Sequence, residues 1–370
     1  MTEVERAVAR IATGAIEGNV RHLRSLLDEG TQLCAVVKAD GYGHGHAAAA
    51  RAALGGGADW LAVATAHEAQ LLREAGLGDA RVLVMGALTR SDLEIALAAR
   101  ADVVAWTREL VDAIGRAGVG GARAHVKLDS GMGRLGTKDP AEARELCDLV
   151  AATDGLELAG LMTHFATADE RGDDHFPHQL GRFEELARDL RAQHPGVTVH
   201  AANSAATYRD KRSHFDLVRC GVAIYGLDPF GEDPAERGLA PALELESYVA
   251  SVKPFEPGDS AGYGRTWKAS KPTWVGVLPI GYGDGWRRGL SNNCDVLVKG
   301  RRCPLVGTVS MDNVTVDLGP DTEVRPGERA VLIGEQDGER ILCEEVATRL
   351  NTINYEVTCG LTARVRREHR

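Results

Sequence analysis

Short apolar segments alternate with longer amphipathic segments over the first 226 residues of the chain. The apolar segments have the length of buried strands, whereas the amphipathic ones repeat with the period of a helix. The pattern predicts eight strands, at 32–38, 59–65, 81–86, 102–106, 122–129, 157–166, 197–203 and 215–226. It predicts helices at 11–31, 44–54, 66–75, 91–99, 107–117, 139–152, 178–193 and 204–211. The helix at 139 has a clear start, with Asp139 as its N-cap and Pro140 at its first position.

Eight strand-then-helix units in about 210 residues are what a (β/α)8 TIM-type barrel requires. A doubly wound open sheet is the alternative, and it usually has fewer strands. After Asp228 and Pro229 the pattern changes to strands separated by turn signals, with one helix-like stretch at 343–350. The predicted strands there lie in ALELESYVASVKPF, TWVGVLPIGYG, CDVLVKG, CPLVGTVSMDNVTVDLG, RAVLIGE and EVTCGLTARVRRE.

The chain is therefore predicted to be an α/β protein of two domains. The first is a barrel at 1–234, whose first 10 residues could pack with the other domain, and the second is a mostly β domain at 235–370.

Composition excludes several classes of partner. The formal net charge of −10 argues against nucleic-acid binding, which needs a basic surface. No apolar run reaches the roughly 18 residues of a membrane helix, and the N-terminus lacks the features of a signal peptide. The seven cysteines show neither CxxC nor zinc-type spacing. We expect reduced, mostly buried thiols in a cytoplasmic protein without membrane or nucleic-acid partners.

Unusual polar residues gather where the predicted barrel strands end. Because catalytic groups of barrels lie at the C-terminal strand ends, several such residues on one rim predict a functional site. The residues at these ends are Lys38, Arg134, His164, Asn203, Ser204 and Arg219.

Lys38 and Arg219 each admit two interpretations. An ammonium on the apolar strand before Lys38 suits a Schiff-base lysine, but a strand-end lysine can also simply reach solvent. Arg219 must find an acceptor, either Asp216 or another barrel acid in a buried ion pair, or the ring nitrogen of a cofactor. The amides of Ser204 and of 221–222 could hold a phosphate. A Schiff-base lysine, a phosphate site and a ring-nitrogen partner together indicate pyridoxal 5′-phosphate (PLP).

Two other patterns are rejected. Residues 131–136 satisfy G-x-G-x-x-G, yet the predicted helix begins three residues after the last glycine instead of directly. The pairs His44/His46 and His175/His178 lack a third ligand at metal spacing, so we predict no metal site.

Nine motifs in order resemble those of bacterial alanine racemases, PLP-dependent enzymes of fold type III, over essentially the whole chain. They are AVVKADGYGHG (35–45), KLDSGMGRLG (127–136), THFATAD (163–169), ANSAA (202–206), RCGVAIYG (219–226), GYGRTW (262–267), PIGYGDGW (279–286), VGTVSMDN (306–313) and NYEVTCGL (354–361). The resemblance implies a homodimeric isomerase that interconverts L-alanine and D-alanine and supplies D-alanine for peptidoglycan.

The resemblance also implies residue roles. Lys38 and Tyr263 would be the two opposed catalytic bases, with Lys38 also carrying the cofactor. The implied cofactor ligands are Tyr42, His164, Asn203, Ser204, Arg219, Gly221, Val222 and Tyr355. Arg134 and the Met311 amide would bind the substrate carboxylate, with Tyr263 and Met311 contributed by the partner subunit. The supporting residues would be Lys127, which is often carbamylated in this family, and Tyr282 and Asp312 at the entrance.

The chain departs from the family pattern beside the substrate site. Ser310 stands where some members have cysteine, and Asn313 stands where glutamine is common, which bears on specificity more than on reaction type. The alternatives are a racemase acting on serine, lysine or arginine, a non-catalytic PLP-binding protein and a related decarboxylase. The last would place an acid on the ring nitrogen, where this chain offers Arg219.

Overall fold

The computed structural model describes residues 5–117 and 121–370 of the chain. These residues form two compact units. The barrel unit comprises 16–41 and 46–224, and the β unit comprises the described residues up to Ala15 together with 42–45 and 225–370. The domain boundary expected near residue 235 stays a prediction.

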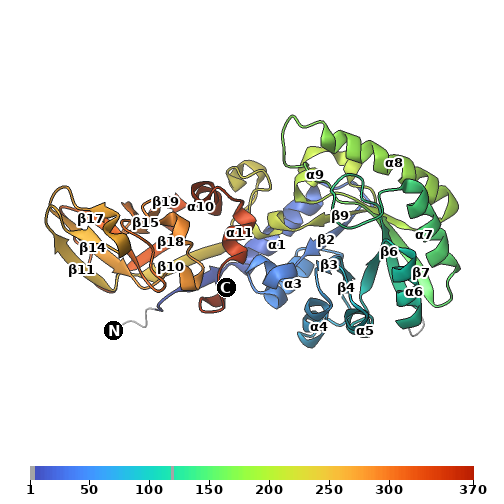
Figure 1. The fold of residues 1–370 in the computed structure, drawn as a ribbon, viewed down its shortest axis with the longest axis horizontal. Coiled ribbons are helices and arrows are strands. Elements are labelled where there is room, and N and C mark those ends of the chain that lie inside the picture. The colour runs from blue at the N-terminus through green and yellow to red at the C-terminus, as the bar shows by residue number, and fades with distance from the viewer. Residues whose placement is uncertain (1–4, 118–120) are drawn as a thin grey trace. The chain divides into compact units, whose positions relative to one another are not determined.

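The barrel unit is a closed barrel of eight parallel strands (Figure 1). They are β2 (Gln32–Val36), β3 (Trp60–Val63), β4 (Arg81–Val84), β5 (Asp102–Ala105), β6 (Ala122–Lys127), β7 (Leu156–Met162), β8 (Thr198–His200) and β9 (Leu217–Cys220). β9 pairs with β2 and closes the barrel, so the predicted TIM-type barrel is confirmed and the open sheet is excluded.

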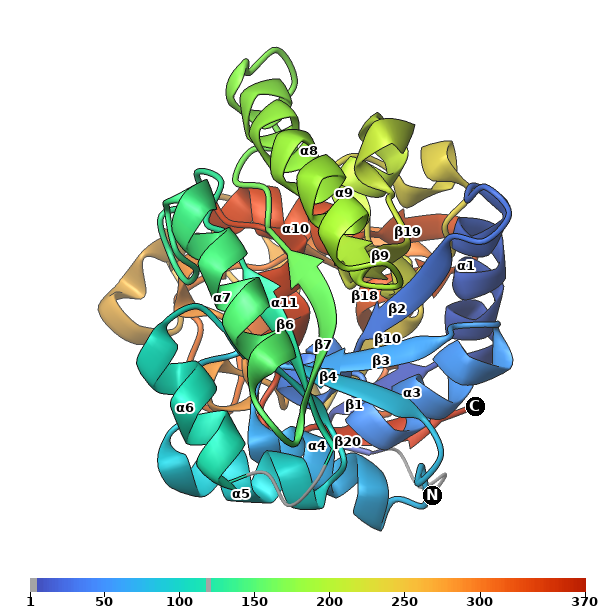
Figure 2. The same cartoon turned by 90° about the vertical axis from the view of Figure 1, so that its right-hand side faces the viewer.

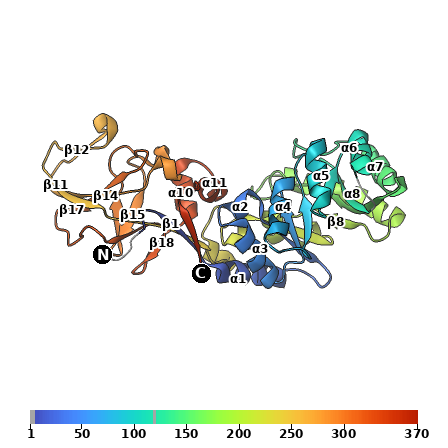
Figure 3. The same cartoon turned by 90° about the horizontal axis from the view of Figure 1, so that it is seen from below.

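Helices lie on the outside of the barrel (Figure 2), where α1 precedes β2 and each of the others follows a barrel strand. They are α1 (Thr13–Ser25), α3 (His46–Gly55), α4 (Ala66–Glu74), α5 (Arg90–Ala98), α6 (Arg108–Ala117), α7 (Pro140–Ala152), α8 (His175–Gln193) and α9 (Ser204–Arg209). The predicted N-cap of α7 is confirmed, because Oδ1 of Asp139 accepts from the amide of Ala141 at 2.8 Å. Helices α3, α4 and α5 run along the barrel wall in Figure 3.

Most predicted segments of the barrel are shorter in the structure, and two of them differ most. The strand predicted at 215–226 ends at Cys220, because the amide of Gly221 leaves the strand ladder and donates to Oγ of Ser204. A 3₁₀ turn, Val222–Tyr225, follows. The helix predicted from residue 11 begins at Thr13 instead, because Val8–Ile11 form strand β1, paired on both sides.

The β unit contains a larger sheet with the order β16-β15-β18-β10-β1-β20, a three-stranded sheet β11-β14-β17 and a short hairpin β12-β13. The strands are β1 (Val8–Ile11), β10 (Leu243–Tyr248), β11 (Ser251–Phe255), β12 (Ser260–Ala261), β13 (Trp267–Lys268), β14 (Thr273–Leu278), β15 (Asp295–Val298), β16 (Arg301–Pro304), β17 (Val314–Gly319), β18 (Arg329–Gln336), β19 (Glu339–Ile341) and β20 (Arg366–His369). β19 extends this sheet from β18.

The β unit has two helices where one was predicted. Helix α10 (Cys343–Leu350) matches the predicted helix-like stretch. The strand predicted in EVTCGLTARVRRE is wrong at its start, where α11 (Asn354–Cys359) forms instead. Tertiary contacts override the β-branched composition there. Buried Asn354 donates through Nδ2 to the carbonyl of Asp228 and to Oε1 of Glu344, both at 2.8 Å, which fixes the start of this helix.

Six of the seven cysteines are buried and Cys359 is exposed, which confirms mostly buried thiols. Of the helices the structure describes, none combines the length and apolar character needed to span a bilayer.

Candidate active site

The segment after β2 adopts a left-handed turn. Ala39, Asp40, Gly41 and Tyr42 have φ between 52° and 60°, of which only Gly41 tolerates this conformation without cost. For each of the other three residues, the left-handed conformation costs roughly 1–2 kcal/mol. Such strain in consecutive residues is typical of a functional segment. The turn begins at Lys38, where the strand leaves the barrel.

Neighbouring groups hold this turn in place. The amide of Ala39 donates to Oε1 of Glu68 at 2.6 Å, and the amide of Gly41 donates to the carbonyl of Val37 at 3.0 Å. Oδ1 of Asp40 accepts from the amide of His46 at 2.9 Å. The backbone around Lys38 is therefore fixed at several points before any ligand binds.

Arg219 lies inside the barrel, 3% exposed. Its Nη2 donates to the carbonyls of Thr163 at 2.7 Å and Ala201 at 2.9 Å, and its Nη1 donates to Nδ1 of His200 at 2.9 Å. Burial lowers its pKa to about 10. Asp216 pairs with Arg191 instead, at 2.7 Å, and Arg219 contacts no carboxylate in the described part of the chain. The interpretation that Arg219 forms a buried ion pair with Asp216 is therefore wrong.

His164 lies beside Arg219, with Nδ1 3.5 Å from Nη2 of the arginine. Burial, followed by the charges of Arg219, Arg134, Lys127 and Lys38, lowers its pKa well below the ordinary value. His164 is therefore a neutral imidazole at neutral pH and adds no further positive charge.

Lys127, the last residue of β6, is buried within this cluster of cations. Burial, followed by the charges of Arg219 and Arg134, lowers its pKa to about 8, against the attraction of Asp129. Lys38 also contributes to this shift, which places its charge close to Lys127. Four cationic side chains therefore share one end of the barrel.

The carboxylate of Asp129 organises the loop after β6. Its Oδ1 accepts from the amides of Gly131 at 3.1 Å and Gly133 at 3.0 Å, and its Oδ2 accepts from the amide of Arg134 at 3.0 Å. These amides are used inside the loop and are not available to a dinucleotide, in agreement with the rejection of that motif. The loop leaves Arg134 exposed.

Ser204 begins α9 and is 3% exposed. Its Oγ accepts from the amide of Gly221 at 3.0 Å and from that of Ala223 at 3.4 Å. Asn203 caps the helix, with its Oδ1 accepting from the amide of Ala206 at 2.9 Å. Val222 lies in the turn between these two amides. The structure therefore brings together Ser204 and the turn that were predicted to bind a phosphate.

The β unit gathers the remaining predicted residues in two places. The rings of Tyr42 and Tyr355 lie 6.1 Å apart between centroids, and Tyr225 packs against Tyr42 at 5.1 Å. The other group is formed by two loops, in which the amide of Gly283 donates to the carbonyl of Met311 at 2.9 Å. This contact brings Tyr282, Met311 and Asp312 together, and Asp312 pairs with Arg364 at 2.6 Å.

Tyr263 stands at the tip of the hairpin β12-β13, a tip that Figure 3 shows at the edge of the β unit. Its side chain is 72% exposed, and that of Met311 is 51% exposed. The carbonyl of Tyr263 accepts from Oγ1 of Thr308 at 2.8 Å, so its backbone is fixed although its ring is not covered.

The groups at the barrel end fit PLP. The cofactor carries a phosphate, an aldehyde that reacts with a lysine amine and a ring nitrogen that accepts a hydrogen bond. Lys38 would meet the aldehyde, Arg219 the ring nitrogen, and the hydroxyl of Ser204 with the neighbouring turn the phosphate. The carboxylate of Asp129, which attracts Lys127, is already satisfied by the amides of its own loop.

Two family models match the chain, the alanine racemase N-terminal domain over residues 11–229 and the alanine racemase C-terminal domain over residues 242–369. The chain belongs to the alanine racemase family. Alanine racemases are PLP-dependent isomerases, so the cofactor expected from the sequence is the cofactor of the family. A single-barrel PLP-binding protein would not match the second model.

Curated alanine racemases cover nearly the whole chain. The alanine racemase of Symbiobacterium thermophilum is 42% identical over 364 residues, which is 97% of this chain and 96% of that protein. Alanine racemase 1 of Bacillus subtilis is 42% identical over 367 residues, covering 97% and 92%.

Solved alanine racemase structures share the fold. The enzyme from E. faecalis superimposes with a TM-score of 0.92 at 36% identity, covering 99% of this chain and 98% of that one. The Bacillus anthracis alanine racemase with bound L-Ala-P gives a TM-score of 0.91 at 35% identity, covering 100% and 96%.

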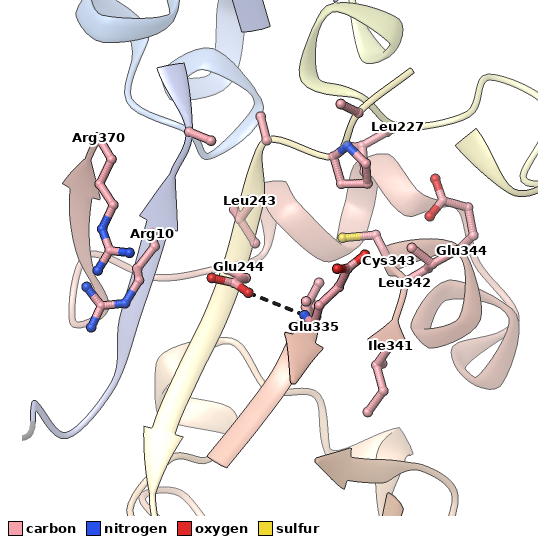
Figure 4. A pocket seen from close by; sticks show the side chains of 16 residues that line it. Arg10, Leu227, Leu243, Glu244, Glu335, Ile341, Leu342, Cys343, Glu344 and Arg370 are labelled. Carbon is pink, nitrogen blue, oxygen red and sulfur yellow. Dashed lines mark hydrogen bonds between the residues drawn. The ribbon is translucent and has the colours of Figure 1, made fainter. Parts of the chain in front are cut away.

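A pocket of about 380 Å³ in the β unit contains none of the predicted site residues (Figure 4). Its walls are mostly apolar, with Leu227 and Leu243 among them, and the carboxylate of Glu244 accepts from the amide of Glu335 at 3.3 Å. Its Arg10 is already paired with glutamates. We therefore expect the racemase chemistry at the barrel end and not in this pocket.

Sequence reasoning missed several polar residues that support the site. Asp129 was included only in the motif at 127–136, without a role, and Glu68 was not considered. Asp102, His125 and His200 were placed in strands without a role. Their signal in the sequence was a polar residue within an apolar strand, the same signal that drew attention to Arg219.

Proposed function

We propose that this chain interconverts L-alanine and D-alanine using PLP, and so supplies D-alanine for peptidoglycan. The observation that carries the proposal is that Lys38, Ser204 and Arg219 stand at the ends of strands of one closed barrel in a chain of the alanine racemase family. Bound PLP supplies an electron-withdrawing system that makes the Cα–H bond of an attached amino acid acidic.

The chain's own residues would hold the cofactor at three points. Lys38 would carry it covalently through Nζ. Ser204 and the turn at Gly221 and Val222 would hold its phosphate, with the amide of Gly221 exchanging its hydrogen bond to Oγ of Ser204 for one to the phosphate. Tyr42 and Tyr355 add hydroxyl donors to the phosphate, while Asn203 fixes the start of α9. Arg219 has an Nε–H that no described group accepts, and this donor is directed to the ring nitrogen.

Arg219 also determines which reaction follows. A guanidinium only donates, so Arg219 would keep the ring nitrogen of bound PLP unprotonated and weakly electron-withdrawing. This favours return of the proton to Cα over transamination or decarboxylation. His164, a neutral imidazole beside Arg219, links this group to the catalytic tyrosine.

Racemisation removes a proton from one face of Cα and delivers one to the other face. A single base cannot reach both faces, so two opposed bases are needed. Lys38 acts on the face of the D-enantiomer, and Tyr263 acts on the face of the L-enantiomer. Arg134 and the amide of Met311 hold the substrate carboxylate between them.

Lys127 becomes carbamylated and then orients Arg134. Its lowered pKa of about 8 leaves a neutral amine fraction that can react with CO₂. The resulting carbamate is an anion placed among Lys38, Arg134 and Arg219. It replaces the repulsion between these cations with attraction.

Tyr263 and Met311 act in the site of a partner subunit, with Tyr282 and Asp312 at its entrance. This proposal is supported by the exposure of Tyr263, Met311 and Tyr282, which are large side chains that a monomer would leave in water.

Mixing two inactive variants tests the shared site. Lys38→Ala and Tyr263→Phe are purified, unfolded together and refolded as a mixture. If Tyr263 acts in trans, a mixed dimer has one intact site and one doubly defective site, so statistical mixing restores about a quarter of the activity. No recovery, with dimers verified by light scattering, would contradict the arrangement in trans.

A panel of L-amino acids tests the substrate. We expect kcat/KM for alanine to exceed that for serine, lysine and arginine at least about tenfold, because a pocket for a methyl group penalises larger side chains. Preference for another amino acid would replace alanine while leaving the chemistry of the site unchanged.

A further inference from the structure

Buried side chains form a hydrogen-bonded chain across the interior of the barrel. Nη1 of Arg219 lies 2.9 Å from Nδ1 of His200, and Nε2 of His200 lies 2.9 Å from Nδ1 of His125. Nε2 of His125 lies 3.1 Å from Oδ2 of Asp102. The four residues come from β9, β8, β6 and β5, and each is at most 3% exposed.

The direction of every hydrogen bond in this chain is fixed from both ends. Arg219 can only donate, so Nδ1 of His200 accepts and its Nε2 carries the proton. That proton is donated to Nδ1 of His125, which leaves Nε2 of His125 to donate to the carboxylate of Asp102. Both imidazoles are neutral, because burial lowers the pKa of each below its ordinary value.

Asp102 remains an anion in this position. Burial opposes ionisation, but the hydrogen bond from His125 and the charges of Arg81 and Arg123 outweigh it and lower the pKa of Asp102. Arg81 donates to Oδ2 at 2.9 Å, and Arg123 donates to Oδ1 at 2.6 Å. Arg219 contacts no carboxylate directly in the described part of the chain, so Asp102 is the anion to which it is connected, through His200 and His125.

The barrel wall leaves room for this series of hydrogen-bonded side chains. A β-carbon on Gly160 of β7 would lie 2.1 Å from Nδ1 of His125, the atom that bonds to His200. The pairing of β6 with β7 shifts register between Ala124 and His125, at the same level. Trp60 packs edge-on against His125 at 5.7 Å and limits how the ring can turn. The imidazole therefore has one position, and Gly160 is needed to keep it.

We propose that Asp102 and His125 are positioning residues that, through His200, orient the guanidinium of Arg219 so that its free Nε–H edge faces the cofactor ring. The proposal rests on the proposed contact between Arg219 and PLP. An amide at position 102 could donate to Nε2 of His125 and reverse the tautomers of both histidines. A protonated Nδ1 of His200 would then face Nη1 of Arg219, donor against donor, and Arg219 would rotate.

The test compares Asp102→Asn with Asp79→Asn. Asp79 is exposed on the arginine-lined surface that also contains Arg81 and Arg123, so its substitution makes the same charge change without touching His125. The first readout is ¹⁵N-histidine NMR of the apoprotein. We expect His125 and His200 to carry their protons on Nε2 in the parent and in Asp79→Asn. In Asp102→Asn we expect both of these Nε2–H tautomers to be lost or reversed.

The second readout is cofactor binding. We expect the Kd for PLP to rise at least about tenfold in Asp102→Asn, with a shifted absorbance maximum of the bound cofactor and a fall in kcat of similar size. KM for alanine should change by no more than roughly twofold, because the substrate contacts are separate. Unchanged tautomers together with a Kd and spectrum equal to those of Asp79→Asn would overturn the proposal.

A second variant covers the case in which Asp102→Asn does not fold. Gly160→Ala keeps the pairing of Asp102 with Arg81 and Arg123 but displaces His125, so it should reproduce the altered tautomers and the weaker PLP binding. Parent-like values would contradict the proposal. If the parent itself neither binds PLP nor racemises alanine, the proposed function fails. The tautomers of the apoprotein still report on the hydrogen bonds from Asp102 to Arg219 in that case.

Discussion

The amide of Arg134 donates to Oδ2 of Asp129 at 3.0 Å, so the predicted substrate-binding arginine is placed by a carboxylate five positions earlier. Asp129→Asn removes the charge that three loop amides face, and we expect KM for alanine to rise about tenfold with a smaller change in kcat. Asp139→Asn is the matched control, because asparagine caps a helix as well as aspartate. Steady-state kinetics of both variants check this, and equal KM values would contradict it.

Lys38→Ala should abolish covalent attachment of PLP. The absorption band of lysine-bound cofactor should disappear, and borohydride reduction followed by peptide mass analysis should label the peptide containing Lys38 only in the parent. Lys211→Ala, which removes an exposed lysine paired with Asp28, should keep both signals. Labelling at another lysine in the parent would show that Lys38 does not carry the cofactor.

Tyr263→Phe should lower racemisation by about 10²- to 10⁴-fold, because it removes one of the two bases, while the PLP absorbance stays the same. Exchange of the α-hydrogen of D-alanine in D₂O should persist through Lys38, whereas exchange from L-alanine should be lost. Tyr208→Phe in α9 serves as the control. Exchange lost from both enantiomers would assign both protons to one group.

Lys127 predicts a dependence of stability on pH. Its pKa falls from 10.5 in the unfolded chain to about 8 in the fold, so the unfolded state binds more protons between these values and stability rises with pH across them. Below pH 8 the buried ammonium costs about 3 kcal/mol, at 1.36 kcal/mol per unit. In CO₂-free buffer, Lys127→Met should therefore be more stable than the parent at pH 7, and the difference should shrink towards pH 10.

Bicarbonate distinguishes the two states of Lys127. Carbamylation replaces the buried cation with an anion, so bicarbonate should raise the melting temperature of the parent and leave that of Lys127→Met unchanged. ¹³C-bicarbonate should give a carbamate signal in the NMR spectrum of the parent. Equal melting curves in both buffers together with no carbamate signal would contradict carbamylation.

The barrel could be predicted from the sequence because its strands are buried on both faces, so each appears as an apolar run closed by a polar residue. Lys38, His164 and Arg219 stood out for the same reason. Helix α11 could not be predicted, because its segment contains β-branched residues and its helical start depends on the distant carbonyl of Asp228. Such a contact leaves no periodic signal in the sequence.

The hydrogen-bonded chain from Asp102 to Arg219 was missed for a related reason. Its members lie 23, 75 and 19 residues apart along the sequence, so only closure of the barrel brings them together. Single polar residues in strands gave no indication of their partners. The sequence offered Asp216 as the nearest acid to Arg219, and proximity along the chain was misleading there.

The burial of six cysteines has a practical consequence for studying this molecule. Burial raises the pKa of each of those thiols, so at neutral pH they do not present a thiolate to a reagent. Cys359 is exposed at the end of α11, the helix that also contains Tyr355. The natural chain therefore offers one attachment point for a fluorophore or spin label, which can follow cofactor loading without any cysteine having to be engineered in or out.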